Sequence, residues 1–135
     1  MAQHGETKVV VAGGGVAALE AALVLRELAH DRVSLELLAP EPHFWYRPLA
    51  VAAPFGLGEV RHYELADIAG RIGAAFTLGA LASVDARAHE ARTTAGSVVQ
   101  YDVLLIACGA VPRAAVHGAL TFRGPADTDR IESLL

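Results

Sequence analysis

Apolar and polar residues follow one another in blocks along the first forty positions of the chain. Residues 8–12 (KVVVA) form a short, β-branched apolar run that leads into three glycines. Residues 16–29 are rich in Ala and Leu, with apolar side chains at steps of three and four, and 33–39 are apolar again before Pro40. This pattern predicts a strand, a tight turn, a helix and a second strand. Because such βαβ units carry parallel strands, we expect an α/β protein with a parallel sheet.

The remaining chain is expected to add one helix and several short strands. Residues 64–75 have apolar side chains at helical spacing, and 76–78 suit a short strand. Three strand-like runs follow, at residues 81–85, 90–93 and 98–101. Because Gly96 suits a hairpin turn, these runs predict a small antiparallel β excursion. The continuous apolar run VLLIA at 103–107 predicts a strand that is buried on both faces and returns to the parallel sheet.

Composition and charge exclude several classes of protein. With 53% hydrophobic and 19% charged residues, the chain is too apolar for a disordered protein. The net charge is −4, and the 11 basic residues are scattered along the sequence. They do not form the basic cluster that binding to nucleic acid or anionic lipid requires. The chain also lacks a signal-peptide pattern and any uncharged apolar run of about 18 residues. We therefore expect a cytoplasmic protein with no transmembrane segment.

Thiol and metal chemistry are not expected. Cys108 is the single cysteine, which excludes an internal disulfide and a catalytic dithiol within this chain. Since it follows an apolar strand and has no basic neighbour in sequence, we interpret Cys108 as a small packed residue rather than a catalytic thiol. The six histidines, His4 among them, show no i, i+4 ligand spacing, and no metal is predicted.

The glycine-rich turn matches the fingerprint of a dinucleotide-binding loop in a Rossmann-like βαβ unit. In Gly13-x-Gly15-x-x-Ala18, the first glycine permits the tight turn, the second lets a pyrophosphate approach, and the alanine brings helix and strand together. The helix amino terminus supplies N–H groups and partial positive charge, so no lysine is required. The absence of GKS or GKT argues against a P-loop nucleotidase. A structural glycine turn without a ligand is the alternative interpretation.

The second strand does not end in the acidic residue that the fingerprint expects to bind the ribose. Ala39 occupies the strand end, Glu36 lies mid-strand, and Glu41 lies two residues beyond the end. Two steps of extended chain return a side chain to the same face, displaced by about 6.6 Å. Glu41 is therefore the candidate for the ribose, although an ordinary loop carboxylate is an equal interpretation. Glu36 is expected to face solvent or the helix.

Three segments together resemble the amino-terminal half of the FAD domain in the FAD-dependent pyridine nucleotide-disulfide oxidoreductase superfamily. They are VVVAGGGVAALEAA, HFWYRPL after the second strand, and YDVLLIACGAVPR near the end. The last is similar to the family's second flavin-contacting motif, an apolar strand followed by Ala-Thr-Gly and then Pro-Arg. The resemblance covers nearly the whole chain, and the spacing of the three segments is more specific than any one of them.

The resemblance implies a set of FAD contacts. They are Gly13, Gly15 and Ala18 at the pyrophosphate, Ala39 at the position of the family's ribose acid, Leu81 with its backbone at the adenine, Pro48 near the isoalloxazine, and Ala107, Cys108 and Gly109 along the flavin. Two of these positions depart from the family pattern. Ala39 has no carboxylate, and Cys108 replaces a threonine, so neither side chain offers the contact that the family has at that position.

The aromatic connection at residues 43–58 supports two interpretations. Phe44, Trp45 and Tyr46 either shelter a flavin ring or pack against another part of the protein. Arg47 pairs either with a phosphate or with a surface acid.

The same connection indicates a subfamily. It lacks the Cys-x-x-x-x-Cys of the disulfide reductases, which excludes a glutathione- or lipoamide-type enzyme. Its YRPL stretch is similar to type II NADH dehydrogenases and sulfide:quinone oxidoreductases. That similarity implies an oxidoreductase in which FAD takes electrons from NAD(P)H, the co-substrate, and passes them to a quinone or sulfur compound.

In this superfamily an NAD(P)H domain interrupts the FAD domain, so the chain is expected to be an incomplete FAD-binding domain. Residues 1–112 would form its amino-terminal half, and 113–135 a connector toward an NAD(P)H domain that is absent here. Catalysis by this chain alone is not expected, and the chain would form a homodimer or associate with the missing part of the enzyme. The alternatives are a stand-alone Rossmann module that binds NAD or an adenine nucleotide, and a dimeric remnant that binds none.

Overall fold

The structure, a computed structural model, describes residues 6–134 of the chain. It divides into two compact units. The first contains the described residues up to Phe44 together with Tyr63–Cys108, and the second contains Trp45–His62 together with the described residues from Gly109 onward. Each unit is described by itself.

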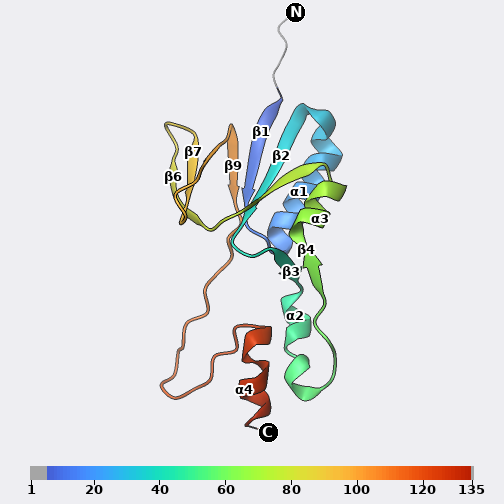
Figure 1. The fold of residues 1–135 in the computed structure, drawn as a ribbon, viewed down its shortest axis with the longest axis vertical. Helices are drawn as coiled ribbons and strands as arrows, with labels where there is room; N and C mark the ends of the chain where they lie inside the picture. Colours follow the sequence, from blue (N-terminus) through green and yellow to red (C-terminus); the bar gives the residue numbers. More distant parts are fainter. Residues whose placement is uncertain (1–5, 135) are drawn as a thin grey trace, which may run out of the picture. The chain divides into compact units, whose positions relative to one another are not determined.

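A four-stranded parallel sheet forms the centre of the first unit (Figure 1). Its strands are β1 (Thr7–Ala12), β2 (Val33–Ala39), β5 (Ala74–Leu78) and β9 (Val103–Ile106), in the order β5-β2-β1-β9. In the register, Val9 lies opposite Leu35 on β2 and Val103 on β9. This arrangement confirms the predicted α/β class and its parallel sheet.

Two helices cover one face of this sheet. Helix α1 (Val16–Ala29) and the short 3-10 helix η1 (His30–Arg32) connect β1 to β2, and α3 (Leu65–Arg71) leads into β5. The side chains that meet in this layer alternate along the strands and recur at helical spacing, as binary patterning requires. The buried ones are Val9, Val11, Leu35, Leu37, Ala39, Ala18, Leu19, Ala22, Leu65 and Ala69.

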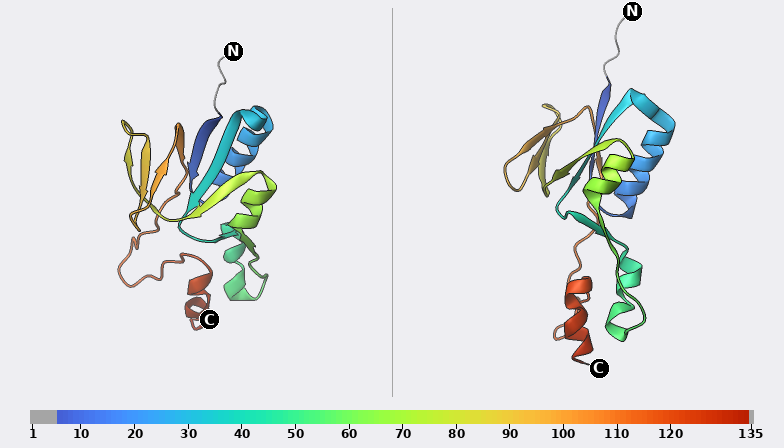
Figure 2. Two further views of the ribbon diagram at one scale, coloured as in Figure 1. Left: turned by 45° about the horizontal axis from the view of Figure 1, so that its top comes forward. Right: turned by 45° about the vertical axis from the view of Figure 1, so that its right-hand side comes forward.

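The opposite face carries a small antiparallel sheet, which confirms the predicted excursion. Its strands are β6 (Leu81–Asp85), β7 (Glu90–Thr93) and β8 (Val98–Gln100). The two sheets enclose a second apolar cluster of Val10, Leu38, Ala91, Val99 and Tyr101. The first unit therefore has three layers, helices, parallel sheet and antiparallel sheet (Figure 2).

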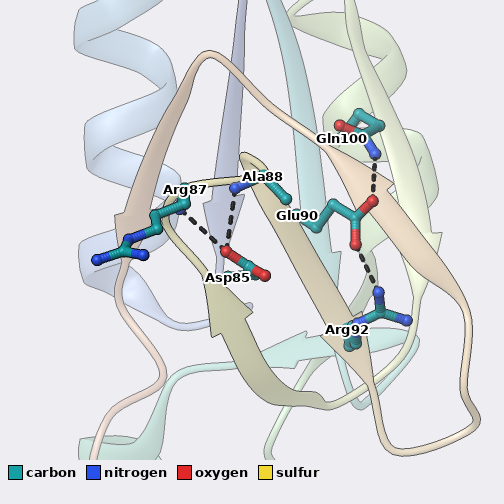
Figure 3. Close-up of polar contacts among 6 residues, drawn as sticks. All are labelled: Asp85, Arg87, Ala88, Glu90, Arg92 and Gln100. Carbon is teal, nitrogen blue, oxygen red and sulfur yellow. Dashed lines mark hydrogen bonds and ion pairs between the residues drawn. The ribbon is translucent and has the colours of Figure 1, made fainter.

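Polar contacts define the turn and the edge of the small sheet (Figure 3). The Asp85 carboxylate accepts hydrogen bonds from the backbone N–H groups of Ala88 and Arg87, both at 3.0 Å. These two donors hold the pKa of Asp85 below its ordinary value. Glu90 joins two strands, because it accepts from Arg92 on its own strand and from Gln100 on β8 at 2.9 Å.

The second unit is built from short helices. Its elements are α2 (Arg47–Ala50), the 3-10 helices η2 (Ala53–Phe55) and η3 (Pro125–Asp127), and α4 (Thr128–Glu132), with α4 packed against η2. Asp127 is buried there, and its carboxylate accepts the backbone N–H of Arg123 at 2.8 Å. Strands β3 (His43–Trp45) and β4 (His62–Glu64) pair as a two-stranded sheet, and most of their residues belong to the first unit.

The structure corrects the prediction that residues 103–107 are buried on both faces. Strand β9 ends at Ile106 and lies at the edge of the sheet, paired only with β1 among the described strands. Val103 is 49% exposed and Ile106 is 63% exposed. The apolar run identifies a strand of a parallel sheet, but burial requires neighbours that this strand does not have.

Two predicted boundaries also move. The predicted helix over 64–75 is α3, which ends at Arg71, and β5 begins at Ala74 rather than at residue 76. Gly73 accounts for both differences, because its φ of +65° turns the chain out of the helix and into the strand.

The side chain of Arg26 connects the carboxyl end of α1 to the carboxyl end of α3. Arg26, in the last turn of α1, donates to the carbonyl oxygens of Ile72 and Gly73 at 2.9 Å each and to that of His30 at 2.6 Å. These carbonyls follow α3 and α1, where helix termini leave acceptors without intrahelical partners. Arg26 therefore fastens α1 to the α3–β5 connection.

We expect Arg26→Ala to lower the free energy of unfolding by about 2 kcal/mol, because carbonyls in a partly buried position lose a charged donor. Arg32→Ala is the matched control, since Arg32 donates only to Leu28 and Ala29 of the neighbouring helix end. Urea denaturation followed by circular dichroism measures both variants. Equal stability of the two variants would contradict the role assigned to Arg26.

Candidate dinucleotide-binding site

The glycine loop lies at the carboxyl end of β1 and is fastened on both sides. The N–H of Gly13 donates to the carbonyl of Leu38 on β2 at 2.8 Å, and the N–H of Ala107 donates to the carbonyl of Ala12 at 2.7 Å. The loop is thus held between the ends of β2 and β9, the position in which parallel sheets bind ligands.

Gly13 is required by the fold. Its φ is +146°, a conformation that side chains rarely adopt. A Cβ at this position would overlap the carbonyl of Ala107 and would lie 2.7 Å from its carbonyl carbon. The close approach of the loop to the end of β9 therefore depends on the missing side chain.

Gly14 also has a structural role, which sequence reasoning did not identify. A Cβ at Gly14 would lie 2.8 Å from Cδ1 of Leu65 and 3.0 Å from Cβ of Ala39. Leu65 begins α3 and is fully buried. The spacing of apolar residues places Leu65 on the core face of a helix, but only tertiary packing brings it under the loop.

Gly15 differs from the other two glycines. It is the N-cap residue of α1 with φ −91°, which any residue adopts, and a Cβ there would meet no atom of the described chain within 4 Å. Neither backbone conformation nor packing requires a glycine at this position. The open space above Gly15 is the feature that a dinucleotide pyrophosphate needs for close approach to the backbone.

The amino terminus of α1 is a suitable anion site. No side chain caps the helix, and its first turn contains no acidic residue. The first intrahelical bond joins the N–H of Leu19 to the carbonyl of Gly15 at 3.1 Å, so the preceding N–H groups have no partner within the helix. Ala18 is buried against the strand, as its position in the fingerprint predicts.

The end of β2 is bonded to the residue that follows β5. The N–H of Gly79 donates to the carbonyl of Ala39 at 2.7 Å, and β6 begins two residues later at Leu81. Ala39 is buried, whereas Glu41 is exposed beyond Pro40. The positions predicted for ribose and adenine therefore belong to one edge of the first unit.

Glu36 faces neither the helix nor open solvent, the two surroundings expected for it. It accepts from Thr77 Oγ1 at 2.7 Å and pairs with Lys8 Nζ at 2.8 Å, on the side of the sheet away from the helices. The alternation along β2 explains this position, because Leu37 and Ala39 face the helices and the even-numbered residues do not.

Ala107 and Cys108 follow β9 at the same end of the sheet as the loop. The prediction that Cys108 is packed is wrong, because the residue is exposed. Its Sγ lies 3.4 Å from the carbonyl of Ala12, a weak hydrogen bond beside the glycine loop. The strand ends at Ile106, so Cys108 lies in the open turn after the edge strand rather than inside the layer.

Arg47, Pro48 and Gly109 belong to the second unit. Arg47 lies over the ring of Trp45, 5.5 Å from its centroid, and it forms no ion pair with an acid among the described residues. Pro48 is exposed at the start of α2, and Gly109 has a φ of +70°. Their approach to a cofactor on the loop stays a prediction.

No group of three or more potential metal ligands occurs among residues 6–134, and His4 lies outside the described residues. Likewise, none of the helices described is both long enough and apolar enough to span a bilayer.

Residues 7–134 match the sequence profile of the pyridine nucleotide-disulphide oxidoreductase family. No protein with a curated description matches the sequence.

Solved structures give a consistent picture of the fold. The sulfide:quinone oxidoreductase of the hyperthermophilic bacterium Aquifex aeolicus is 25% identical over 95% of this chain and 31% of its own, with a TM-score of 0.81. NDH2 from Plasmodium falciparum is 18% identical over 94% of this chain and 28% of its own, with a TM-score of 0.74. The ferredoxin reductase of the CYP199A2 system from Rhodopseudomonas palustris is 21% identical over 94% of this chain and 34% of its own, also with a TM-score of 0.74. This chain therefore spans about a third of each of these proteins.

The three loop glycines should respond differently to an added methyl group. We expect Gly13→Ala to cost about 3 kcal/mol or more, because it combines a disfavoured φ with overlap at Ala107. Gly15→Ala should change stability by less than about 1 kcal/mol, since its backbone is extended and its surroundings are open. Denaturant unfolding of both variants measures the difference, and comparable losses would contradict the assignment of Gly15 to a ligand.

Proposed function

The chain belongs to the pyridine nucleotide-disulphide oxidoreductase family, and from this premise we propose that its glycine loop binds the pyrophosphate of FAD. The observation that carries the proposal is the open space above Gly15. A Cβ at this position would meet no atom of the described chain within 4 Å, so packing does not explain the glycine. The uncapped amino terminus of α1 beside it supplies N–H donors and partial positive charge to the phosphates.

The residues that would hold the cofactor fit its phosphate and adenine portions. Gly13 would form the turn, with its N–H held by Leu38, and Gly15 would let the pyrophosphate approach the backbone. Leu81 would offer backbone to the adenine, two residues after Gly79, which bonds Ala39. Ala107, Cys108 and Gly109 would line the flavin, with Pro48 near its ring. When bound, the flavin supplies the hydride- and electron-transfer chemistry, and the protein supplies binding and orientation.

The whole enzyme would transfer electrons from NAD(P)H to a second acceptor, a quinone or a sulfur compound. The HFWYRPL segment and the 25% identity to a sulfide:quinone oxidoreductase support this class of acceptor. Since this chain spans about a third of that protein, we propose that it is the FAD-binding portion and is inactive alone.

Cofactor titration tests the proposal. We expect FAD to bind this chain in isothermal calorimetry more tightly than NAD, and Gly15→Val to weaken FAD binding at least tenfold, about 1.4 kcal/mol. The valine would occupy the space that the pyrophosphate needs, while circular dichroism should show an unchanged fold.

Gly70→Val is the matched control. Gly70 lies on the exposed surface of α3, and a Cβ there also meets nothing within 4 Å. Unchanged FAD affinity in Gly15→Val would refute the phosphate-loop assignment. Tighter binding of NAD than FAD would favour a stand-alone nucleotide-binding module, and no binding by a folded chain would favour a remnant.

A further inference from the structure

A polar cavity lies in the first unit, at the ends of β1 and β9 that are opposite the glycine loop. Its volume is about 380 Å³, which falls within the range of roughly 300–1,000 Å³ that small-molecule sites occupy. Its walls come from the start of β1, the turn before β7, the end of β8 and the connection from β8 to β9. The lining residues are Lys8, His89, Gln100, Tyr101 and Asp102.

The charge balance of this cavity favours a cation. The ammonium group of Lys8 is already paired with Glu36, with Nζ 2.8 Å from the carboxylate. The Asp102 carboxylate accepts the backbone N–H of Lys8 at 2.7 Å but forms no ion pair among the described residues. The charge in the wall that lacks a counter-ion is therefore negative.

His89 adds an acceptor in a fixed orientation. Its backbone is left-handed, with φ +55°, and its carbonyl accepts the N–H of Tyr101 at 3.0 Å. The ring Nδ1 lies 3.2 Å from the carbonyl oxygen of Tyr101, and the two rings are 5.6 Å apart between centroids. Because a carbonyl only accepts, Nδ1 carries the hydrogen of this bond. In the neutral ring, Nε2 is then an acceptor with a free lone pair.

Gln100 supplies a further acceptor. Its amide nitrogen donates to Glu90 at 2.9 Å, and Glu90 also accepts from Arg92 (Figure 3). Since a carboxylate only accepts, the amide nitrogen is fixed toward Glu90, and the amide oxygen remains available to a donor. Three of the five lining residues thus present acceptors, on Asp102, His89 and Gln100.

We propose that this cavity binds a small guanidinium compound. A guanidinium group is a permanent cation with five N–H donors in a planar arrangement and no acceptor. It would form a charge-assisted pair with the carboxylate of Asp102, and its remaining N–H groups would donate to His89 Nε2 or to the amide oxygen of Gln100. The inference does not depend on the proposed FAD site, because the cavity lies at the opposite ends of the strands.

Two probes of the same shape test the proposal. N-acetylarginine amide carries the guanidinium group, and N-acetylcitrulline amide replaces it with a neutral urea. In a titration followed by nuclear magnetic resonance, the arginine probe should bind with a Kd on the order of 1 mM and shift the signals of the His89 ring and the Tyr101 amide. The citrulline probe should bind at least about tenfold more weakly, because it lacks the charge.

Two substitutions locate the site. Asp102→Asn keeps an acceptor for the N–H of Lys8 but removes the charge, so the arginine probe should bind at least about fivefold more weakly. Asp67→Asn is the matched control, since Asp67 is exposed on α3. His89→Asn should weaken binding about threefold, because asparagine tolerates the left-handed backbone but lacks the imidazole. His30→Asn is its control, since His30 also has a positive φ, +49°, and does not line the cavity.

Several outcomes overturn the inference. Equal affinity for the two probes would show that the cavity does not select a cation. Equal affinities of Asp102→Asn and Asp67→Asn for the arginine probe would place any binding elsewhere. Should Asp102→Asn not fold, as judged by circular dichroism, the ratio of the two probes and the shift of the His89 ring decide. If FAD binds and the arginine probe does not, the inference fails and the proposed function stands; the reverse result refutes the proposed function alone.

Discussion

The approach of the glycine loop to the end of β9 is the contact on which the site depends. β1 is flanked by β2 on one side and β9 on the other, so the backbone at its end is bonded in both directions. Gly13 can make the turn between these neighbours only because it has no side chain to meet the carbonyl of Ala107. The direction of α1, and with it the orientation of the free N–H groups at its amino terminus, follows from that turn.

The three glycines of the loop differ in the reason for which each lacks a side chain. Two are required by the chain's own packing, at Ala107 and at Leu65, and one is not. The fingerprint assigns Gly13 to the turn and Gly15 to the pyrophosphate and leaves Gly14 unspecified. The structure gives Gly13 and Gly14 packing reasons and leaves only Gly15 without an internal one. Ala39, at the end of β2, shows the opposite situation. Its side chain is fully packed, but it offers no polar atom to a ligand. The open surface at Gly15 is therefore the feature of the loop that supports the proposed pyrophosphate site.

The sequence predicted local elements well where short-range signals agree. Helix α1 begins after Gly15 and ends at Ala29, as its apolar spacing indicates, because the glycine turn and the polar HDR segment delimit it. Neighbours across the fold were harder to predict. The burial of β9, the exposure of Cys108 and the face occupied by Glu36 all depend on which strands lie alongside, and an apolar run does not contain that information. The contact between Gly14 and Leu65 was missed for the same reason.

The pairing of β1 with β9 has a consequence for the order in which the molecule folds. Ala12 and Cys108, which meet at the loop, are 96 positions apart in the chain. Contacts of such long range cost loop-closure entropy before they return any stabilisation, and they form late. A nascent chain can complete its βαβ unit and still lack a finished turn at Gly13 until β9 has joined the sheet. The proposed binding site is thus expected to be completed only when the distant β9 segment has joined β1, although the residues of the loop are among the first to be synthesised.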